Sequence, residues 1–136
     1  MAIEKIIGEL ATGVGEATGF TQLDWAKDAF RQYLSLECYP GTVNVLATSD
    51  QARAAWERVC GWDGIILPPP QPEWCASRAW HARINGEIPA AAILPDVDSY
   101  PATQIELIAP VAVRGTLGLK DGDPVTVEIS DGTEAI

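Results

Sequence analysis

Short apolar or alternating segments, separated by strong turn signals, restrict the fold of this 136-residue sequence more than any other feature. The strongest of these signals is Asn85-Gly86, a dipeptide that favours the two-residue turn of a β-hairpin. It separates residues 74–84, which alternate loosely, from the apolar residues 88–94. Further strands are expected at residues 5–12, 42–45, 104–110 and 124–129.

Helical spacing is found in two segments. Residues 24–36 follow a capping Asp24, and a second helix is capped by Ser49 or Asp50 and runs to about residue 59. Residues 111–119 predict a short helical or turn segment. Since strands and helices do not alternate in βαβ units, we predict a mainly β (α+β) fold, a small compact β-barrel with one or two helices.

Composition excludes several kinds of partner. The formal net charge is −10 and the pI is about 4.3, so a nucleic-acid partner is not expected. No apolar run approaches the ~20 residues of a membrane helix, and the first residues do not resemble a signal peptide, so we predict a cytoplasmic protein without a membrane partner. The three cysteines lack metal-ligand spacing and are expected to be reduced. We expect one domain over residues 1–130 followed by a frayed acidic tail at 131–136, and no pattern in the sequence defines an oligomeric state.

Residues 39–45 combine a turn with a polar strand start. Pro40-Gly41 is typical of a type II turn, which needs a positive φ at its glycine. In the alternation that follows, Thr42 and Asn44 share one face, while Val43 and Val45 point into the core. A hydroxyl and an amide oxygen side by side suit Mg²⁺, a cation that prefers oxygen ligands. The alternative is a turn and a strand with two solvated polar residues.

Residues 12–19 contain three closely spaced glycines. Such a segment allows the backbone to approach a phosphate and to direct several N–H groups into one concavity. It lacks the lysine of a P-loop and the full spacing of a dinucleotide fingerprint. A flexible hairpin loop is therefore an equal alternative.

Four segments, taken in order, carry a resemblance to a known family: residues 12–18, 39–44, 104–114 and 117–125. They resemble the archaeal-type CTP-dependent riboflavin kinases over most of the chain, least so at about residues 49–74. The resemblance implies a six-stranded cradle-loop β-barrel. It also implies an enzyme that phosphorylates riboflavin to FMN, using CTP as phosphate donor and Mg²⁺ as the cation.

The resemblance further implies roles for individual residues. Thr42 and Asn44 match the Mg²⁺ ligands. Glu106 matches the acidic residue beside the flavin, which orients the ribityl hydroxyl or acts as general base; from spacing alone it is equally well a strand carboxylate satisfied by backbone amides or by Arg114. The nucleotide-binding residues implied are Gly13, Val14, Gly15, Glu16, Ala17 and Thr18 in the glycine segment and Val111, Ala112, Val113 and Arg114 after the acidic strand.

Two positions depart from the family pattern. Ala17 stands where the family has another glycine, and a methyl group there is strained if φ is positive. Asp98-Ser99-Tyr100 stands where the family has a Thr-Tyr-His-type run, so Ser99 supplies the flavin-binding hydroxyl if the loop shifts by one residue. Two alternatives stay open: an inactive nucleotide- or flavin-binding sensor on the same barrel, and a protein-interaction domain.

Overall fold

The computed structural model describes residues 2–11, 24–69, 76–95 and 102–136. Its strands are β1 (Ile3–Ala11), β2 (Val43–Leu46), β3 (Ile65–Leu67), β4 (Ser77–Ile84), β5 (Ile88–Pro95), β6 (Gln104–Ile108) and β7 (Pro124–Ser130). Its helices are α2 (Asp24–Leu34), α3 (Asp50–Cys60) and α4 (Val113–Leu117). In this part of the chain no helix is long and apolar enough to cross a membrane.

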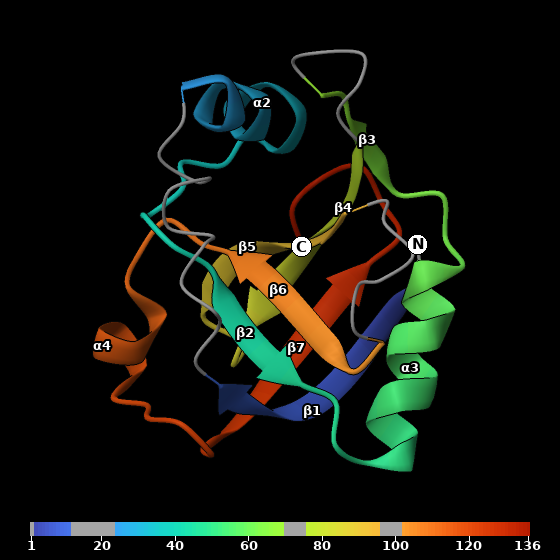
Figure 1. Ribbon diagram of the computed structural model, residues 1–136, viewed down its shortest axis with the longest axis vertical. Coiled ribbons are helices and arrows are strands. Elements are labelled where there is room, and N and C mark those ends of the chain that lie inside the picture. The colour runs from blue at the N-terminus through green and yellow to red at the C-terminus, as the bar shows by residue number, and fades with distance from the viewer. Residues whose placement is uncertain (1, 12–23, 70–75, 96–101) are drawn as a thin grey trace.

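The strands form a closed antiparallel barrel with the helices around it (Figure 1). The strand order is β4-β5-β6-β2-β1-β7, and β7 closes the ring by pairing with residues 82–84 of β4. The short β3 pairs with the first residues of β4, 77–79, and lies outside the six-stranded ring. The predicted mainly β barrel is therefore confirmed, with the short α4 as a third helix.

Local chemistry explains where several elements end. Asn85 and Gly86 have φ values of 51° and 69°, as the predicted two-residue hairpin turn requires. The helix expected over residues 24–36 ends at Leu34, because Ser35 takes a positive φ of 53°. The amide of Leu36 then donates to the Phe30 carbonyl at 3.2 Å, a bond that closes the helix end.

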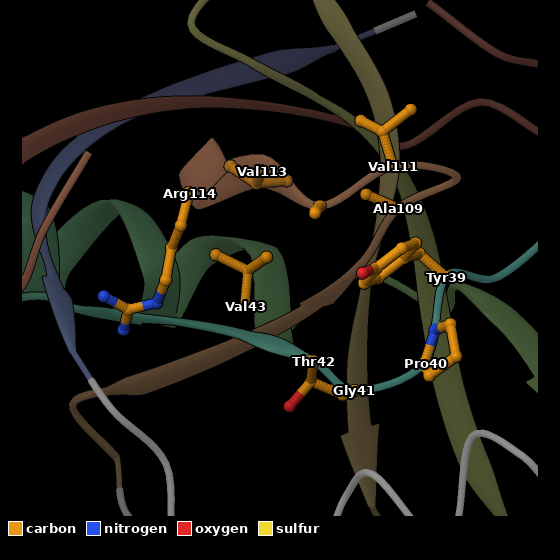
Figure 2. A pocket seen from close by; sticks show the side chains of 10 residues that line it. Tyr39, Pro40, Gly41, Thr42, Val43, Ala109, Val111, Val113 and Arg114 are labelled. Carbon is orange, nitrogen blue, oxygen red and sulfur yellow. The ribbon is translucent and has the colours of Figure 1, made fainter. Parts of the chain in front are cut away.

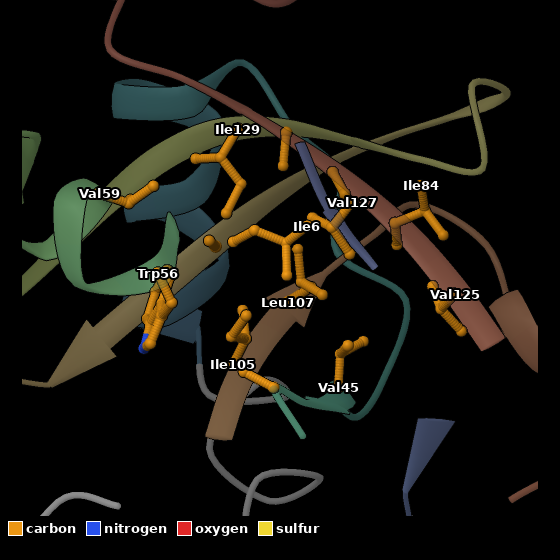
Figure 3. Packing of buried hydrophobic residues seen from close by; sticks show 14 of the residues in the cluster. Ile6, Val45, Trp56, Val59, Ile84, Ile105, Leu107, Val125, Val127 and Ile129 are labelled. Atoms are coloured by element: carbon orange, nitrogen blue, oxygen red, sulfur yellow. The ribbon is translucent and has the colours of Figure 1, made fainter. Parts of the chain in front are cut away.

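The barrel interior holds the larger hydrophobic cluster. Figure 3 shows side chains of β1, β2, β6 and β7 directed into it, together with Trp56 and Val59 of α3. Ser49 caps this helix, since its Oγ accepts a hydrogen bond from the Ala52 amide at 3.0 Å. A second cluster lies outside the barrel, where Phe30 of α2 packs near Ile93 of β5. Because β5 is covered on both faces, it is apolar over most of its length.

The last residues of the chain lie against the barrel. The Asp131 amide donates to the Ala2 carbonyl at 3.0 Å, and the Ala2 amide donates to Asp131 Oδ1 at 2.8 Å. On β4, His81 Nε2 lies 3.2 Å from the Thr133 carbonyl oxygen, and the Arg83 guanidinium donates to the Ile136 carbonyl. The acidic composition of residues 131–136 suggests a frayed tail, whereas these contacts attach the tail to β1 and β4.

His81 makes stability depend on pH. Burial lowers the pKa of His81 below its ordinary value, and the hydrogen bond to Thr133 opposes this effect. The unfolded chain then binds a proton at higher pH than the folded chain, so the free energy of unfolding should fall as the pH drops below about 6.5. Urea denaturation between about pH 7.5 and about pH 5.5 measures this loss. His81→Asn should show a smaller loss over the same range, and equal losses in the two proteins would contradict the prediction.

Candidate functional site

An open pocket of about 160 Å³ lies between the start of β2 and the segment that follows β6 (Figure 2). It is lined by residues 39–43 on one side and by Ala109 and residues 111–114 on the other. These are two of the segments that the sequence singles out, and they are far apart along the chain. The barrel brings them together because β2 and β6 are neighbouring strands.

Backbone geometry holds the two walls in place. The Tyr39 amide donates to the Ala109 carbonyl at 2.7 Å, and the first residue of β2, Val43, pairs with Leu107 of β6. Between them Gly41 has a φ of 97°, the positive value expected for the glycine of the Pro40-Gly41 turn. The turn therefore directs the chain from one pocket wall into the barrel.

Arg114 is the only charged residue among the described residues that line the pocket. Its Nη2 lies 2.6 Å from Asp121 Oδ1, and the two side chains are 42% and 55% exposed. Asp121 belongs to a turn that also binds β1, since the Gly122 amide donates to the Leu10 carbonyl at 2.8 Å. Leu10 is two residues before the glycine segment, so this turn connects the base of that segment with Arg114.

Besides Arg114, several polar side chains lie on the outer face of β2 and β6. Val45 belongs to the interior cluster and Val43 packs against it, so Asn44 between them faces outward. By the same alternation Glu106 faces outward, and it lies directly opposite Asn44 in the β2–β6 register. The Thr42 side chain points away from that of Val43 (Figure 2), as the alternation along the chain predicts.

Asn44 is buried, with 6% of its surface exposed, and its amide is hydrogen bonded. Gln104 Nε2 donates to Asn44 Oδ1 at 2.8 Å. On its other side Asn44 pairs with Ala11, the last described residue before the glycine segment. Asn44 therefore lies between the base of the glycine segment and Glu106. We call the outward-facing residues Thr42, Asn44 and Glu106 the outward row.

The oxygen atoms that these side chains offer as ligands suit Mg²⁺ better than a softer metal. In the described ranges no group of three or more His, Cys, Asp or Glu side chains could hold a metal ion. Thr42, Asn44 and Glu106 offer a hydroxyl, an amide and a carboxylate oxygen. Mg²⁺ is commonly held by one or two carboxylates together with water and phosphate oxygens, so these residues fit that cation.

Comparison with protein families gives one match over most of the chain. The model of the CTP-dependent riboflavin kinase family, described as domain of unknown function DUF120, matches residues 10–129. The chain belongs to this family.

Archaeal proteins named riboflavin kinase are similar to the chain. The one from Pyrobaculum calidifontis is 34% identical over 128 residues, which is 92% of this chain and 59% of that protein. The one from Archaeoglobus fulgidus is 37% identical over 128 residues, 92% of this chain and 54% of that protein. The one from Sulfurisphaera tokodaii is 33% identical over 133 residues, 93% of this chain and 96% of that protein. This riboflavin kinase family domain therefore spans little more than half the length of the first two relatives and nearly all of the third.

The structure places only some of the residues that the resemblance selects. Thr42 and residues 111–114 line one pocket, and Asn44 lies opposite Glu106 on the next strand. Asn44 is not among the residues that line the pocket. The predicted nucleotide-loop residues 13–18 and the predicted flavin contact Ser99 lie outside the described residues.

The environment of Glu106 bears on one of its sequence-based alternatives, an ion pair with Arg114. All nine lysines and arginines lie within the described ranges. Arg114 pairs with Asp121, and none of the basic side chains forms an ion pair with Glu106 in the part of the chain that the structure covers. Neutralisation of Glu106 by Arg114, one of the structural alternatives, is therefore not observed.

Three residues with a place in or beside the site were missed from the sequence. Tyr39 forms part of the pocket wall, Asp121 pairs with Arg114, and Gln104 binds Asn44. The spacing of Gln104 and Glu106, two residues apart on one strand, could have placed Gln104 on the outer face. No sequence signal indicates that Asp121 meets Arg114, because the pairing depends on how the turn folds back.

Proposed function

We propose that this domain is a CTP-dependent riboflavin kinase, which transfers the terminal phosphate of CTP to a ribityl hydroxyl of riboflavin and gives FMN and CDP. One observation carries the proposal: residues 39–43 and 111–114, two separate segments of the family pattern, form one pocket beside the Asn44–Glu106 pair. The names of the archaeal relatives support riboflavin as the substrate, and the family name supports CTP as the phosphate donor. Phosphoryl transfer requires mainly the positioning of both substrates and stabilisation of phosphate charge, and this arrangement offers both.

The pocket is the proposed nucleotide site. Its walls are mostly apolar side chains, so the base would be recognised through backbone groups of residues 111–113. Arg114 supplies the positive charge that an anionic ligand needs in a chain with a net charge of −10. The glycine segment that follows Ala11 would bring further backbone N–H groups to the phosphates.

The outward row is the proposed reaction centre. The ribityl oxygen forms a bond to the terminal phosphorus of CTP, the bond from that phosphorus to the bridging oxygen breaks, and CDP leaves with the electron pair. Glu106 orients the attacking hydroxyl and accepts its proton. Thr42 and Asn44 would hold Mg²⁺, which when bound neutralises charge on the phosphate oxygens. Ser99 remains the predicted hydroxyl contact to the flavin.

A phosphorylation assay tests the proposal directly. The folded domain is incubated with riboflavin, CTP and Mg²⁺, and FMN is separated and measured by its fluorescence, with ATP in a parallel reaction. FMN formation with CTP, lost when Mg²⁺ is chelated, is the expected result. If the folded domain forms no FMN with either nucleotide, the proposal is wrong. In that case calorimetric binding of CDP or riboflavin would favour the sensor alternative.

Arg114→Met should weaken CTP binding while leaving the fold intact. A charge-assisted hydrogen bond to phosphate contributes roughly 1.5–3 kcal/mol, and we take the low end because this side chain is 42% exposed. The KM for CTP should then rise about tenfold, with a smaller change in the KM for riboflavin.

The matched control is Arg53→Met. Arg53 is exposed to a similar degree, 43%, but it lies on α3, where it binds Asp50 and the Thr48 carbonyl. Its replacement should leave both KM values unchanged. An equal rise in the KM for CTP in the two variants would contradict a specific role for Arg114.

A further inference from the structure

Six large hydrophobic side chains remain exposed in the described part of the chain, and two of them lie on the pocket. Tyr39 is 49% exposed and Val111 is 37% exposed, and they belong to different walls. Figure 2 shows the Tyr39 ring directed toward the side of the pocket where Val43 lies. Exposed apolar surface inside a concave site is typical of a site that binds a ligand.

The backbone holds Tyr39 in place on its wall. Its amide donates to the Ala109 carbonyl at 2.7 Å, and the next residue, Pro40, restricts Tyr39 to extended backbone angles. The ring then rotates about only two side-chain bonds, so little conformational entropy is lost when a ligand orders it. Tyr39 therefore offers a flat aromatic face from a fixed point of the backbone.

The two ends of the pocket differ chemically. In Figure 2 the Tyr39 ring and the Arg114 guanidinium lie well apart, on either side of Val43. The Arg114 end is connected to the base of the glycine segment, because its partner Asp121 belongs to the turn that binds Leu10. A ligand with a planar ring at one end and an anionic group at the other fits both ends. Cytidine nucleotides have that form, whereas riboflavin has no anionic group.

We propose that the cytosine base of the nucleotide stacks on the Tyr39 ring while its phosphates extend toward Arg114. This inference rests on the proposed function, because it places CTP in this pocket. Every base has a π face, so stacking adds affinity but does not select cytosine. Selection is left to the backbone groups of residues 111–113, whose donors and acceptors distinguish the edges of different bases.

Binding of CDP in the presence of Mg²⁺, measured by calorimetry, tests the stacking contact. Tyr39→Leu keeps an apolar side chain and removes the flat face. The Kd for CDP should then rise about tenfold, within the range that stacking of a base on an aromatic ring contributes. Tyr39→Phe keeps the face and should stay within about twofold of the parent domain. Equal losses in the two variants would assign the effect to the hydroxyl and overturn the proposal.

Tyr33→Leu is the matched control. Tyr33 is 38% exposed, but it lies on α2 and is not among the residues that line the pocket. Its replacement should leave the Kd for CDP unchanged, and a rise equal to that of Tyr39→Leu would contradict a specific contact. Urea denaturation confirms that each variant is folded.

The Kd for riboflavin, measured on the same variants, separates the two substrates. Tyr39→Leu should leave it unchanged. If Tyr39→Leu instead weakens riboflavin binding and leaves CDP binding at the parent value, the ring contacts the flavin and the stacking proposal is wrong.

The outcomes also distinguish this inference from the proposed function. If the parent domain binds CDP and forms FMN, but Tyr39→Leu binds CDP as tightly as the parent, the stacking contact is wrong and the kinase proposal stands. If the parent domain neither binds CDP nor forms FMN, both proposals are wrong.

Discussion

Replacing Asn44 by alanine is expected to lower kcat for FMN formation by roughly 100-fold or more, an effect comparable to the loss of one preorganised group that stabilises transition-state charge. The reason is local. Asn44 lies opposite Glu106 on the outer face of the barrel. Its side-chain oxygen is the proposed ligand of the cation beside the phosphates. Initial rates measured over a range of Mg²⁺ concentrations test the prediction, and the Mg²⁺ concentration at half-maximal rate should also rise.

Asn44→Asp is the matched variant. It keeps an oxygen at the same position, so it should retain much more activity than Asn44→Ala at high Mg²⁺. Because Asn44 is buried and bonded to Gln104, the alanine variant also loses stability, by roughly 1–3 kcal/mol. The assays are therefore run well below the unfolding temperature of each variant. Full activity of folded Asn44→Ala at every Mg²⁺ concentration would show that Asn44 holds no cation.

Replacing Gly8 by a larger residue is expected to have the largest effect on stability. A Cβ atom at Gly8 would lie 2.5 Å from the Leu46 carbonyl oxygen and 2.6 Å from Val45 Cγ1, both far closer than van der Waals contact. The carbonyl belongs to β2, the strand paired with β1, so it cannot move without disturbing the β1–β2 pairing. Overpacking of this kind typically costs about 1–3 kcal/mol, and we expect Gly8→Ala near the upper end.

Gly8→Val should be worse, and it should remove a large fraction of a typical total stability of about 5–15 kcal/mol. Urea denaturation followed by tryptophan fluorescence measures both changes. Gly115→Ala is the control, because a Cβ there meets no atom within 4 Å and the residue lies in α4. That substitution should raise the free energy of unfolding by about 0.5–1 kcal/mol. Equal stabilities of Gly8→Ala and the parent domain would contradict the close approach.

Much of the barrel could be predicted from local sequence patterns. The alternation over residues 42–45 correctly placed Val45 inside the barrel and Asn44 outside it. The turn signals Pro40-Gly41 and Asn85-Gly86 have the positive φ values that their residue types favour. These features depend on neighbours in the chain, through backbone sterics and side-chain periodicity, so a single sequence carries them.

Other features required the closed ring of strands. The close approach of Gly8 to Leu46 exists only because β1 pairs with β2. The acidic tail has the composition of a solvated end, yet it lies on β4 where His81 and Arg83 meet carbonyl oxygens. Composition cannot indicate such contacts, because the partners are distant in sequence.

The candidate site also combines features that follow from the sequence with features that follow only from the fold. The sequence by itself determined which residue types and strand faces carry the polar groups, because alternation and turn chemistry act over a few residues. Only the tertiary structure decided that residues 39–43 share a pocket with residues 111–114, that Arg114 pairs with Asp121, and that Gln104 donates a hydrogen bond to Asn44. Those contacts depend on strand register and barrel closure, and both are set by the packing of the whole chain.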